Sequence, residues 1–236
     1  MDPQSLKFRS PVYRYLRDIE AEFAEVNGYA VATSIGDAGA QVAAARNLAM
    51  CDLSGLARVG VKGTGIGRWL SAQDLTVPTE PNRALRQDNG SLIAMLADNE
   101  ALVLGNFEQR NRNVEELIAA FVSGRESADP PAGLLVPRQH SQAWFRLTGH
   151  DMAATLAKVC AVDLRAAFFD NLQIAQTSVA RLNAIVIRDD LADVPAVHVL
   201  ADSASAEYLW ECLLDAGAEH DIRVIGLHAL QELIRS

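Results

Sequence analysis

The sequence predicts an α+β protein built from two similar βαββα halves that pack together. Segments that alternate between apolar and polar residues, as half-buried strands do, are followed by a glycine and then by apolar residues at helical spacing. The order strand, glycine, helix, two strands, helix occurs twice, and Gly149 follows its strand as Gly63 does, at an offset of 149 − 63 = 86. A polar stretch rich in glycine and proline, residues 123–133, separates the two copies.

The composition is that of a folded protein with an acidic surface. Half of the 236 residues are hydrophobic and only 22% are charged, which excludes global disorder. The 21 Lys and Arg are outnumbered by 30 Asp and Glu, giving a net charge of −9. A general nucleic-acid-binding surface would show a basic stripe, so we expect no nucleic acid partner.

The three cysteines, Cys51, Cys160 and Cys212, are scattered and form no Cys-x-x-Cys pair. This spacing argues against a disulfide framework and against a zinc site, and predicts reduced thiols in the core. The N-terminus lacks a hydrophobic signal core, and no apolar run reaches membrane-spanning length. We therefore expect a soluble, cytoplasmic protein with no membrane partner.

Residues 1–55 are expected to hold an N-terminal helix and an Ala/Gly-rich loop. Ser10-Pro11 is typical of a helix start, and Asn27-Gly28 would end the helix. Between them, apolar residues recur at helical spacing and would form one face: Val12, Tyr15, Ile19, Phe23 and Val26. Residues 29–50 show weak periodicity and are interpreted as a loop with a short helix over Gln41–Met50.

Residues 56–124 form the first predicted half. A strand over 57–62 ends at Gly63, and a short helix begins at Ile66. A hairpin follows, with strands Leu92–Leu96 and Ala101–Leu104 and a turn at Asp98-Asn99. Asn113 is the predicted cap of the next helix, and residues 125–139 are the predicted linker.

Residues 140–236 form the second predicted half. It starts with a strand over 143–148 and a helix from Met152. One strand is expected from about Thr177 to Ile187 and another over 196–200, before a helix over Ser205–Ala216. A last strand, Ile222–Ile225, and a short helix, Leu227–Ile234, close the chain.

Glycines 63, 65 and 67 follow a strand and precede a helix, which invites a dinucleotide-binding interpretation. The Rossmann pattern G-x-G-x-x-G needs a small residue where Arg68 stands, and no βαβ unit with a ribose-binding acid follows. A tight turn is the favoured interpretation. A small dehydrogenase that uses this loop remains an alternative, which NAD-dependent thermal stabilisation would reveal.

Other polar residues give no catalytic pattern. The five histidines fall at no metal-ligand spacing, so surface or capping roles are predicted for them. Asp189-Asp190 lies in the turn DDLADVP, which turn chemistry explains better than acid catalysis does. Trp144 lies in a strand opposite the side of Phe145, so it is interpreted as a core residue or an interface residue. No catalytic, cofactor-binding or metal-ligating residue is assigned to this chain.

Several runs taken together resemble the gamma subunit of heterotetrameric sarcosine oxidase. They are SPVYRYL at 10–16, LTVPTEPNRAL at 75–85, LTGHDMAATLAKVCAVDL at 147–164, the segment 160–182, and SASAEYLWECLLDAG at 203–217. That subunit is in turn similar to part of the glycine-cleavage T protein, an aminomethyltransferase that binds tetrahydrofolate. The resemblance implies a T-protein-like fold, which fits the two predicted halves.

The resemblance also implies a role in one-carbon metabolism. In the T protein, a Gly-Gly-Ile-x-Asp-Asp type strand supplies an essential carboxylate, but the matching strand here, Gly90–Leu96, is apolar at those positions. This implies a non-catalytic subunit of an oxidoreductase complex that oxidatively demethylates sarcosine or a related N-methyl amine and passes the one-carbon unit to tetrahydrofolate. In that family the alpha and beta subunits hold FAD, FMN, NAD and tetrahydrofolate, and no cofactor is expected on this chain.

The expected partners are those alpha and beta flavoprotein subunits. The N-terminal helix and the strand from Thr177 are the predicted partner surface, with Tyr15, Phe23, Gln176 and Arg181 as contacts. The alternative is a stand-alone, tetrahydrofolate-binding, aminomethyltransferase-like protein, which would bind tetrahydrofolate without partners.

Overall fold

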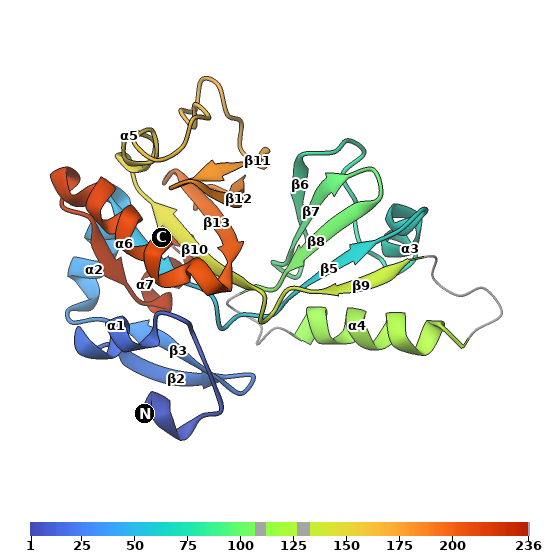
Figure 1. The fold of residues 1–236 in the computed structure, drawn as a ribbon, viewed down its shortest axis with the longest axis horizontal. Coiled ribbons are helices and arrows are strands. Elements are labelled where there is room, and N and C mark those ends of the chain that lie inside the picture. Colours follow the sequence, from blue (N-terminus) through green and yellow to red (C-terminus); the bar gives the residue numbers. More distant parts are fainter. Residues whose placement is uncertain (107–111, 127–132, 236) are drawn as a thin grey trace. The chain divides into compact units, whose positions relative to one another are not determined.

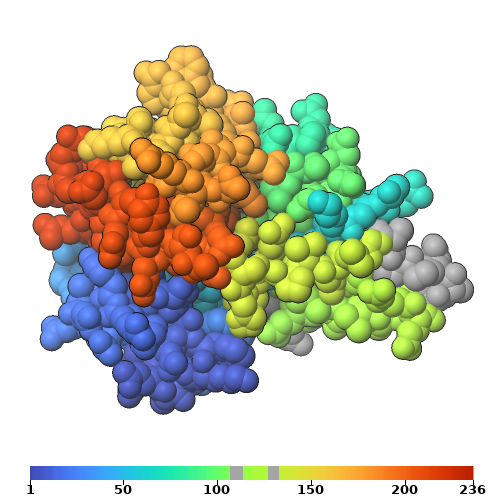
Figure 2. All heavy atoms as spheres, in the orientation of Figure 1, coloured from blue at the N-terminus to red at the C-terminus, as the bar shows by residue number. Residues whose placement is uncertain are grey.

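The computed structural model describes residues 1–106, 112–126 and 133–235. By its internal contacts the chain forms two compact units, which we call unit 1 (residues 1–55 and 141–236) and unit 2 (residues 56–140) (Figure 1). The first and last parts of the chain therefore belong to one unit, and their blue and red atoms touch in Figure 2. As domains, the predicted segments 1–55, 56–124, 125–139 and 140–236 stay a prediction.

Unit 2 contains a sheet whose described strands pair in the order β6-β7-β8-β5-β9. The strands are β5 (Arg58–Lys62), β6 (Arg83–Arg86), β7 (Leu92–Ala97), β8 (Glu100–Leu104) and β9 (Leu134–Pro137). Helices α3 (Ile66–Ser71) and α4 (Arg112–Gly124) contribute Ile66, Leu70 and Phe121 to a core against the sheet. The predicted hairpin is confirmed, because β7 and β8 pair antiparallel across Asp98-Asn99.

Unit 1 contains a larger sheet, which we call the large sheet, with its described strands in the order β11-β12-β13-β10-β4-β14. The strands are β4 (Ala49–Asp52), β10 (Gln142–Thr148), β11 (Ile174–Val179), β12 (Leu182–Arg188), β13 (Ala196–Asp202) and β14 (Arg223–Ile225). The described α-helices of unit 1 are α1 (Tyr13–Asp18), α2 (Ala38–Asn47), α5 (Met152–Leu156), α6 (Ala206–Gly217) and α7 (Leu227–Arg235). Short 3-10 helices lie at Pro3–Ser5, Ser203–Ser205 and Ala218–His220.

One face of the large sheet packs into the main hydrophobic core. On β10 the residues that point to this side are Ala143, Phe145 and Leu147, all fully buried. The ring of Phe145 meets that of Trp210 from α6 edge-on, with 5.0 Å between ring centroids. The apolar residues at alternate positions of β10 and those at helical spacing on α6 thus pack in one core, as the sequence pattern predicts.

The internal repeat is present, with two more described strands than predicted in the first half, β6 and β9, and one more in the second, where β11 and β12 replace a single predicted strand. Both halves run βαβββαβ, and the strands β6-β7-β8-β5 pair in the same order as β11-β12-β13-β10. Gly63 and Gly149 both have positive φ, 152° and 109°, and Leu70 and Leu156 are both fully buried. The halves differ at one edge, because β9 pairs with β5 directly whereas β4 lies between β10 and β14.

The single strand predicted from Thr177 to Ile187 is wrong, because two strands occupy this region. β11 and β12 pair antiparallel around a tight turn at Ala180 and Arg181, which have φ of 49° and 66°. Such turns normally carry Asn or Gly, since those residues tolerate positive φ. The usual turn residues are missing here, so the sequence pattern hides the turn.

The long N-terminal helix is also wrong. Helix α1 covers only Tyr13–Asp18, and it ends in a turn where Glu20 has φ of 60° and the N–H of Ala21 donates to the carbonyl of Leu16. Glycine is the common residue at such a helix end. Because Glu stands there instead, the sequence does not indicate that the helix ends.

A hairpin occupies the region expected to hold the end of the helix and the loop. β2 (Glu22–Val26) and β3 (Tyr29–Ser34) pair antiparallel, and β3 also pairs with β1 (Phe8–Arg9). Asn27-Gly28, with φ of 50° and 78°, is their turn and not a helix stop. A helix is present within the predicted loop-and-helix region 29–50, but it begins at Ala38, before the predicted start at Gln41.

Two further predictions change at the end of unit 2. Part of the predicted linker, Leu134–Pro137, is β9, which pairs with β5, while residues 127–132 lie outside the described part of the chain. Helix α4 begins at Arg112, before the predicted cap Asn113, whose side chain is also outside the described part. The apolar residues Leu134, Leu135 and Val136 make this segment a strand despite its neighbours Pro130 and Pro131.

Candidate functional site

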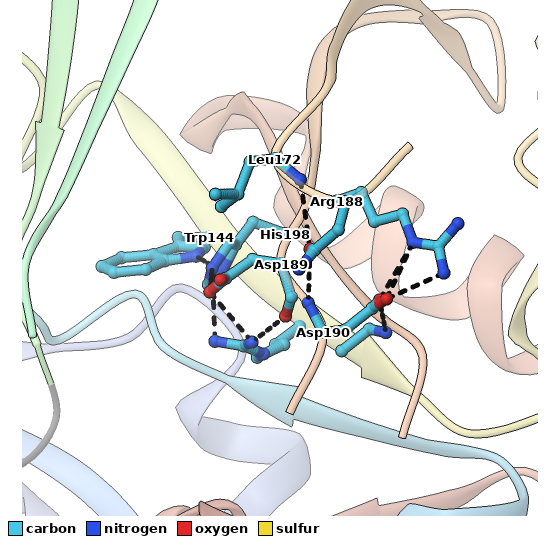
Figure 3. A network of polar contacts seen from close by, with 9 residues as sticks. Trp144, Leu172, Arg188, Asp189, Asp190 and His198 are labelled. Carbon is cyan, nitrogen blue, oxygen red and sulfur yellow. Dashed lines mark hydrogen bonds and ion pairs between the residues drawn. The ribbon is translucent and has the colours of Figure 1, made fainter. Parts of the chain in front are cut away.

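A group of polar side chains lies buried on the other face of the large sheet. On β10 the alternation turns Trp144 and Arg146 away from the main core, and the strand register places His198 of β13 directly opposite Arg146. Asp189 follows the end of β12, where its N–H donates to the carbonyl of Ala196 at 2.9 Å. We call Trp144, Arg146, Asp189 and His198 the buried cluster; Figure 3 labels Trp144, Asp189 and His198.

The hydrogen bonds of the buried cluster fix the protonation of its histidine. The indole N–H of Trp144 can only donate, and it lies 2.9 Å from Nδ1 of His198, so Nδ1 accepts. A neutral His198 then carries its proton on Nε2, which donates to Oδ2 of Asp189 at 3.0 Å. Nη1 of Arg146 lies 3.2 Å from the same Nε2, and because both atoms are donors this approach is a packing contact.

The buried cluster contains one ion pair that is closed to water. Nη2 of Arg146 donates to Oδ2 of Asp189 at 3.0 Å and also to the main-chain carbonyl of Asp189. The exposed fractions of the two side chains are only 1% and 4%. Because a buried charge is tolerated when it is paired and hydrogen-bonded, each partner requires the other.

The neighbouring acid belongs to a second, separate ion pair. Asp190 accepts from Nε and Nη2 of Arg188 at 3.0 and 2.8 Å, and its Oδ1 also accepts from the N–H of Ala196 at 3.1 Å. Figure 3 shows the carboxylates of Asp189 and Asp190 extending in different directions. The two carboxylates therefore belong to separate ion pairs and do not form a paired carboxylate site.

The buried cluster corrects two sequence-based assignments. The sequence pattern predicts a surface or capping role for His198, but this residue is 2% exposed and lies buried on a face of the large sheet. Asp189 does lie beside a turn, yet it is 3% exposed and pairs with a cation 43 residues earlier. The available signal was Arg146 and His198 on the polar side of two otherwise apolar strands, since isolated charged positions there need a buried partner.

An open cavity of about 420 Å³ lies on the same sheet face, further along the strands. Leu200, which lines it, is the register partner of Trp144, so the cavity adjoins the buried cluster. Its polar lining consists of amides, a hydroxyl and one carboxylate: Gln142, Gln176, Asn183, Thr177 and Asp202. These groups can hydrogen-bond a polar molecule, but none is a strong nucleophile.

The four predicted contact residues do not converge. Tyr15 on α1 is 38% exposed and lies edge-on to Trp210, whereas Phe23 on β2 is 6% exposed and belongs to the main core. Gln176 is exposed on β11, and Arg181 is exposed at the β11–β12 turn beside Tyr208 and Cys212. The placement of Phe23 on an exposed helix face is therefore wrong, because the segment is a strand whose apolar side is buried.

The remaining candidate groups are distributed over both units. The three cysteines are free thiols; Cys51 and Cys160 are buried, and burial, with Asp52 adding to it, raises the pKa of the Cys51 thiol. Gly65, with φ of 82°, precedes α3 and confirms a tight turn there. Among the described residues, no three His, Cys, Asp or Glu side chains gather closely enough to hold a metal ion. None of the described helices is long and apolar enough to cross a membrane.

Comparison with known proteins identifies the fold. No family model and no curated protein sequence matches this chain. The structure is similar to the glycine cleavage system aminomethyltransferase T from Bartonella henselae, with a TM-score of 0.72 and 17% identity, over 96% of this chain and 61% of that one. The chain thus spans less than two thirds of that protein.

A second similar structure is heterotetrameric sarcosine oxidase from Corynebacterium sp. U-96 in complex with pyrrole 2-carboxylate. The TM-score is 0.62 and the identity 18%, over 90% of this chain and 95% of that one. Sequence resemblance, internal repeat and structural similarity agree. The chain therefore has an α+β fold of the glycine-cleavage T protein type, similar to that of a chain of heterotetrameric sarcosine oxidase.

Proposed function

We propose that this chain is a non-catalytic, structural subunit of a cytoplasmic, sarcosine-oxidase-like flavoenzyme complex. The complex would oxidatively demethylate sarcosine or a related N-methyl amine and transfer the one-carbon unit to tetrahydrofolate. Its alpha and beta flavoprotein subunits would hold FAD, FMN, NAD and tetrahydrofolate, and this chain would hold none of them. The gamma subunit of heterotetrameric sarcosine oxidase is the family member it resembles.

The observation that carries this proposal is the apolar character of β7. By the resemblance, this strand matches the one that bears the essential carboxylate in the T protein. Here Ala94 and Met95 lie on it with exposed fractions of 0% and 5%. Neither side chain can accept a proton or pair with a cation, so the carboxylate's role cannot be carried out from this strand.

The buried cluster supports the same proposal. It holds an acid, a base and a cation within hydrogen-bonding distance, which elsewhere would be a candidate catalytic group. Here the histidine uses both nitrogens within the protein, and Asp189 is neutralised by Arg146. The four residues have exposed fractions between 1% and 3%, so a substrate has no access to them. In this proposal the cluster joins β10, β13 and the end of β12 and has a structural role.

A titration of the isolated chain with tetrahydrofolate tests the non-catalytic assignment. We expect no binding heat by calorimetry, because the strand that should carry the acid is apolar. An authentic T protein titrated under the same conditions is the positive control. Micromolar binding by the isolated chain would contradict the proposal and favour the alternative, a stand-alone tetrahydrofolate-binding, aminomethyltransferase-like protein.

A further inference from the structure

A second cavity in unit 1, of about 610 Å³, is lined by none of the residues of the buried cluster. Its walls come from α1, α2, α6 and β14 with the segment before it, and Figure 1 shows α1, α2 and α6 in the same region of unit 1. The volume falls within the range of about 300–1,000 Å³ that small-molecule sites occupy. We call it the α1–β14 cavity.

The walls of the α1–β14 cavity are largely apolar and fixed in place. The apolar lining residues pack with their other sides against the main core; they include Ile19, Ile35, Leu214, Ile222 and Val224. The ring of Tyr15, which is 38% exposed, also lines the cavity and lies edge-on to Trp210, with 5.6 Å between ring centroids. An apolar body can therefore contact side chains that are already packed against the core, which limits the ordering cost of binding.

One polar wall residue is already engaged within the protein. Gln41 is 6% exposed, and its Oε1 accepts from the N–H groups of Ile35 and Gly226 at 3.1 and 2.9 Å. Its Nε2 donates to Oγ of Ser34 at 3.1 Å. Gln41 thus fastens α2 to β3 and to the start of α7, and it stabilises the wall.

Two opposite charges line the same cavity without pairing. Asp221 and Arg223 are separated by one residue, yet among the described residues neither side chain forms an ion pair or hydrogen bond, with the other or with a third group. The backbone around them is fixed: the N–H of Ile222 donates to Gly217 at 3.2 Å, and that of Arg223 donates to Leu48 at 3.1 Å. An exposed negative side chain and an exposed positive side chain therefore line an apolar cavity from a fixed stretch of backbone.

We propose that the α1–β14 cavity binds a small zwitterion with an apolar body, the chemistry of a hydrophobic α-amino acid. The guanidinium of Arg223 receives the carboxylate, and the carboxylate of Asp221 receives the ammonium group. The apolar body lies between Tyr15 and Leu214. A molecule with both charges is favoured over one with a single charge, because each charge alone leaves one protein group unpaired.

Three probes with the same phenyl body separate the contributions of the charges. They are L-phenylalanine, phenethylamine with only the ammonium, and 3-phenylpropionate with only the carboxylate. Calorimetric titration of the full chain should show L-phenylalanine binding about fivefold more tightly than either singly charged probe, since partly exposed ion pairs contribute up to about a factor of five each. Equal binding of the three probes, or no binding of L-phenylalanine at millimolar concentration, would overturn the proposal.

Four variants then assign the charges to residues. Arg223→Gln should weaken L-phenylalanine and 3-phenylpropionate and leave phenethylamine unchanged, and Asp221→Asn should do the reverse for the two singly charged probes. Ala44→Leu, which fills the cavity, should weaken all three probes, and the exposed Arg235→Gln on α7 serves as the matched control. If neither Arg223→Gln nor Asp221→Asn changes the affinity for any of the three probes, the assignment of the charges is refuted. These measurements involve neither partner subunits nor tetrahydrofolate. Their failure would therefore leave the proposed function untouched, and the failure of the proposed function would leave this proposal untouched.

Discussion

Replacing Asp189 with Asn should lower the free energy of unfolding by about 3–5 kcal/mol, the loss typical when one partner of a buried ion pair is removed. Arg146 would keep its positive charge with an exposed fraction of 1% and without a counter-ion. His198 would also lose a charged acceptor for its Nε2 proton. Urea unfolding followed by circular dichroism measures the effect.

Two further variants make this prediction specific. Asp163→Asn removes the acid of an exposed pair, whose side chains are 41% and 68% exposed, and should leave the unfolding midpoint unchanged. The double variant Arg146→Met, Asp189→Leu removes both buried charges and should recover part of the lost stability. If Asp189→Asn is as stable as the original protein, the charge of Arg146 does not depend on Asp189.

Replacing Gly149 with Ala should destabilise unit 1 by about 3 kcal/mol or more. Gly149 has φ of 109°, and an added Cβ would lie 2.2 Å from the carbonyl oxygen of Asn47. That oxygen cannot easily move, because it accepts a hydrogen bond from the N–H of Asp151. Gly149 is also held in place, because its own N–H donates to the carbonyl of Pro195 at 2.9 Å. Backbone strain and overpacking each cost about 1–3 kcal/mol. Thermal unfolding of the purified variant is the measurement.

Gly36 provides the matched control, since its φ is also positive, 66°, but an added Cβ would meet nothing within 4 Å. Gly36→Ala should therefore show only the conformational penalty, about 1–2 kcal/mol. Similar losses for the two variants would mean that the close approach at Asn47 is not what requires a glycine in the repeat.

The parts of the fold that the sequence predicted are those with strong local signals. The alternation over Ala143–Thr148 and the Leu209, Trp210, Leu213 spacing on α6 identified elements whose apolar side does pack into the main core, although β10 is buried on both of its sides. The errors fall where an unusual residue occupies a turn. Glu20 ends α1 in a left-handed conformation, and Ala180-Arg181 forms a hairpin turn without Asn or Gly.

The candidate site was less predictable, because its members come together only through strand register. Arg146 and His198 are 52 residues apart and face each other because β10 pairs with β13. Asp189 looked like a turn residue, since a buried carboxylate and an exposed one have the same local sequence pattern. The apolar character of β7, in contrast, could be predicted from the sequence alone, because the absence of an acid from a segment requires no tertiary information.

The most direct test of the subunit assignment is the mass of the particle that forms when this chain is co-expressed with the alpha and beta flavoprotein subunits of a heterotetrameric sarcosine oxidase. We predict a single species that contains this chain in fixed stoichiometry and whose flavin absorbance co-elutes with it on size-exclusion chromatography with light scattering. Tyr15→Glu, at a predicted contact that is 38% exposed, should reduce that species more than it lowers the stability of the isolated chain. A chain that stays monomeric and free of flavoprotein in this experiment would contradict the assignment.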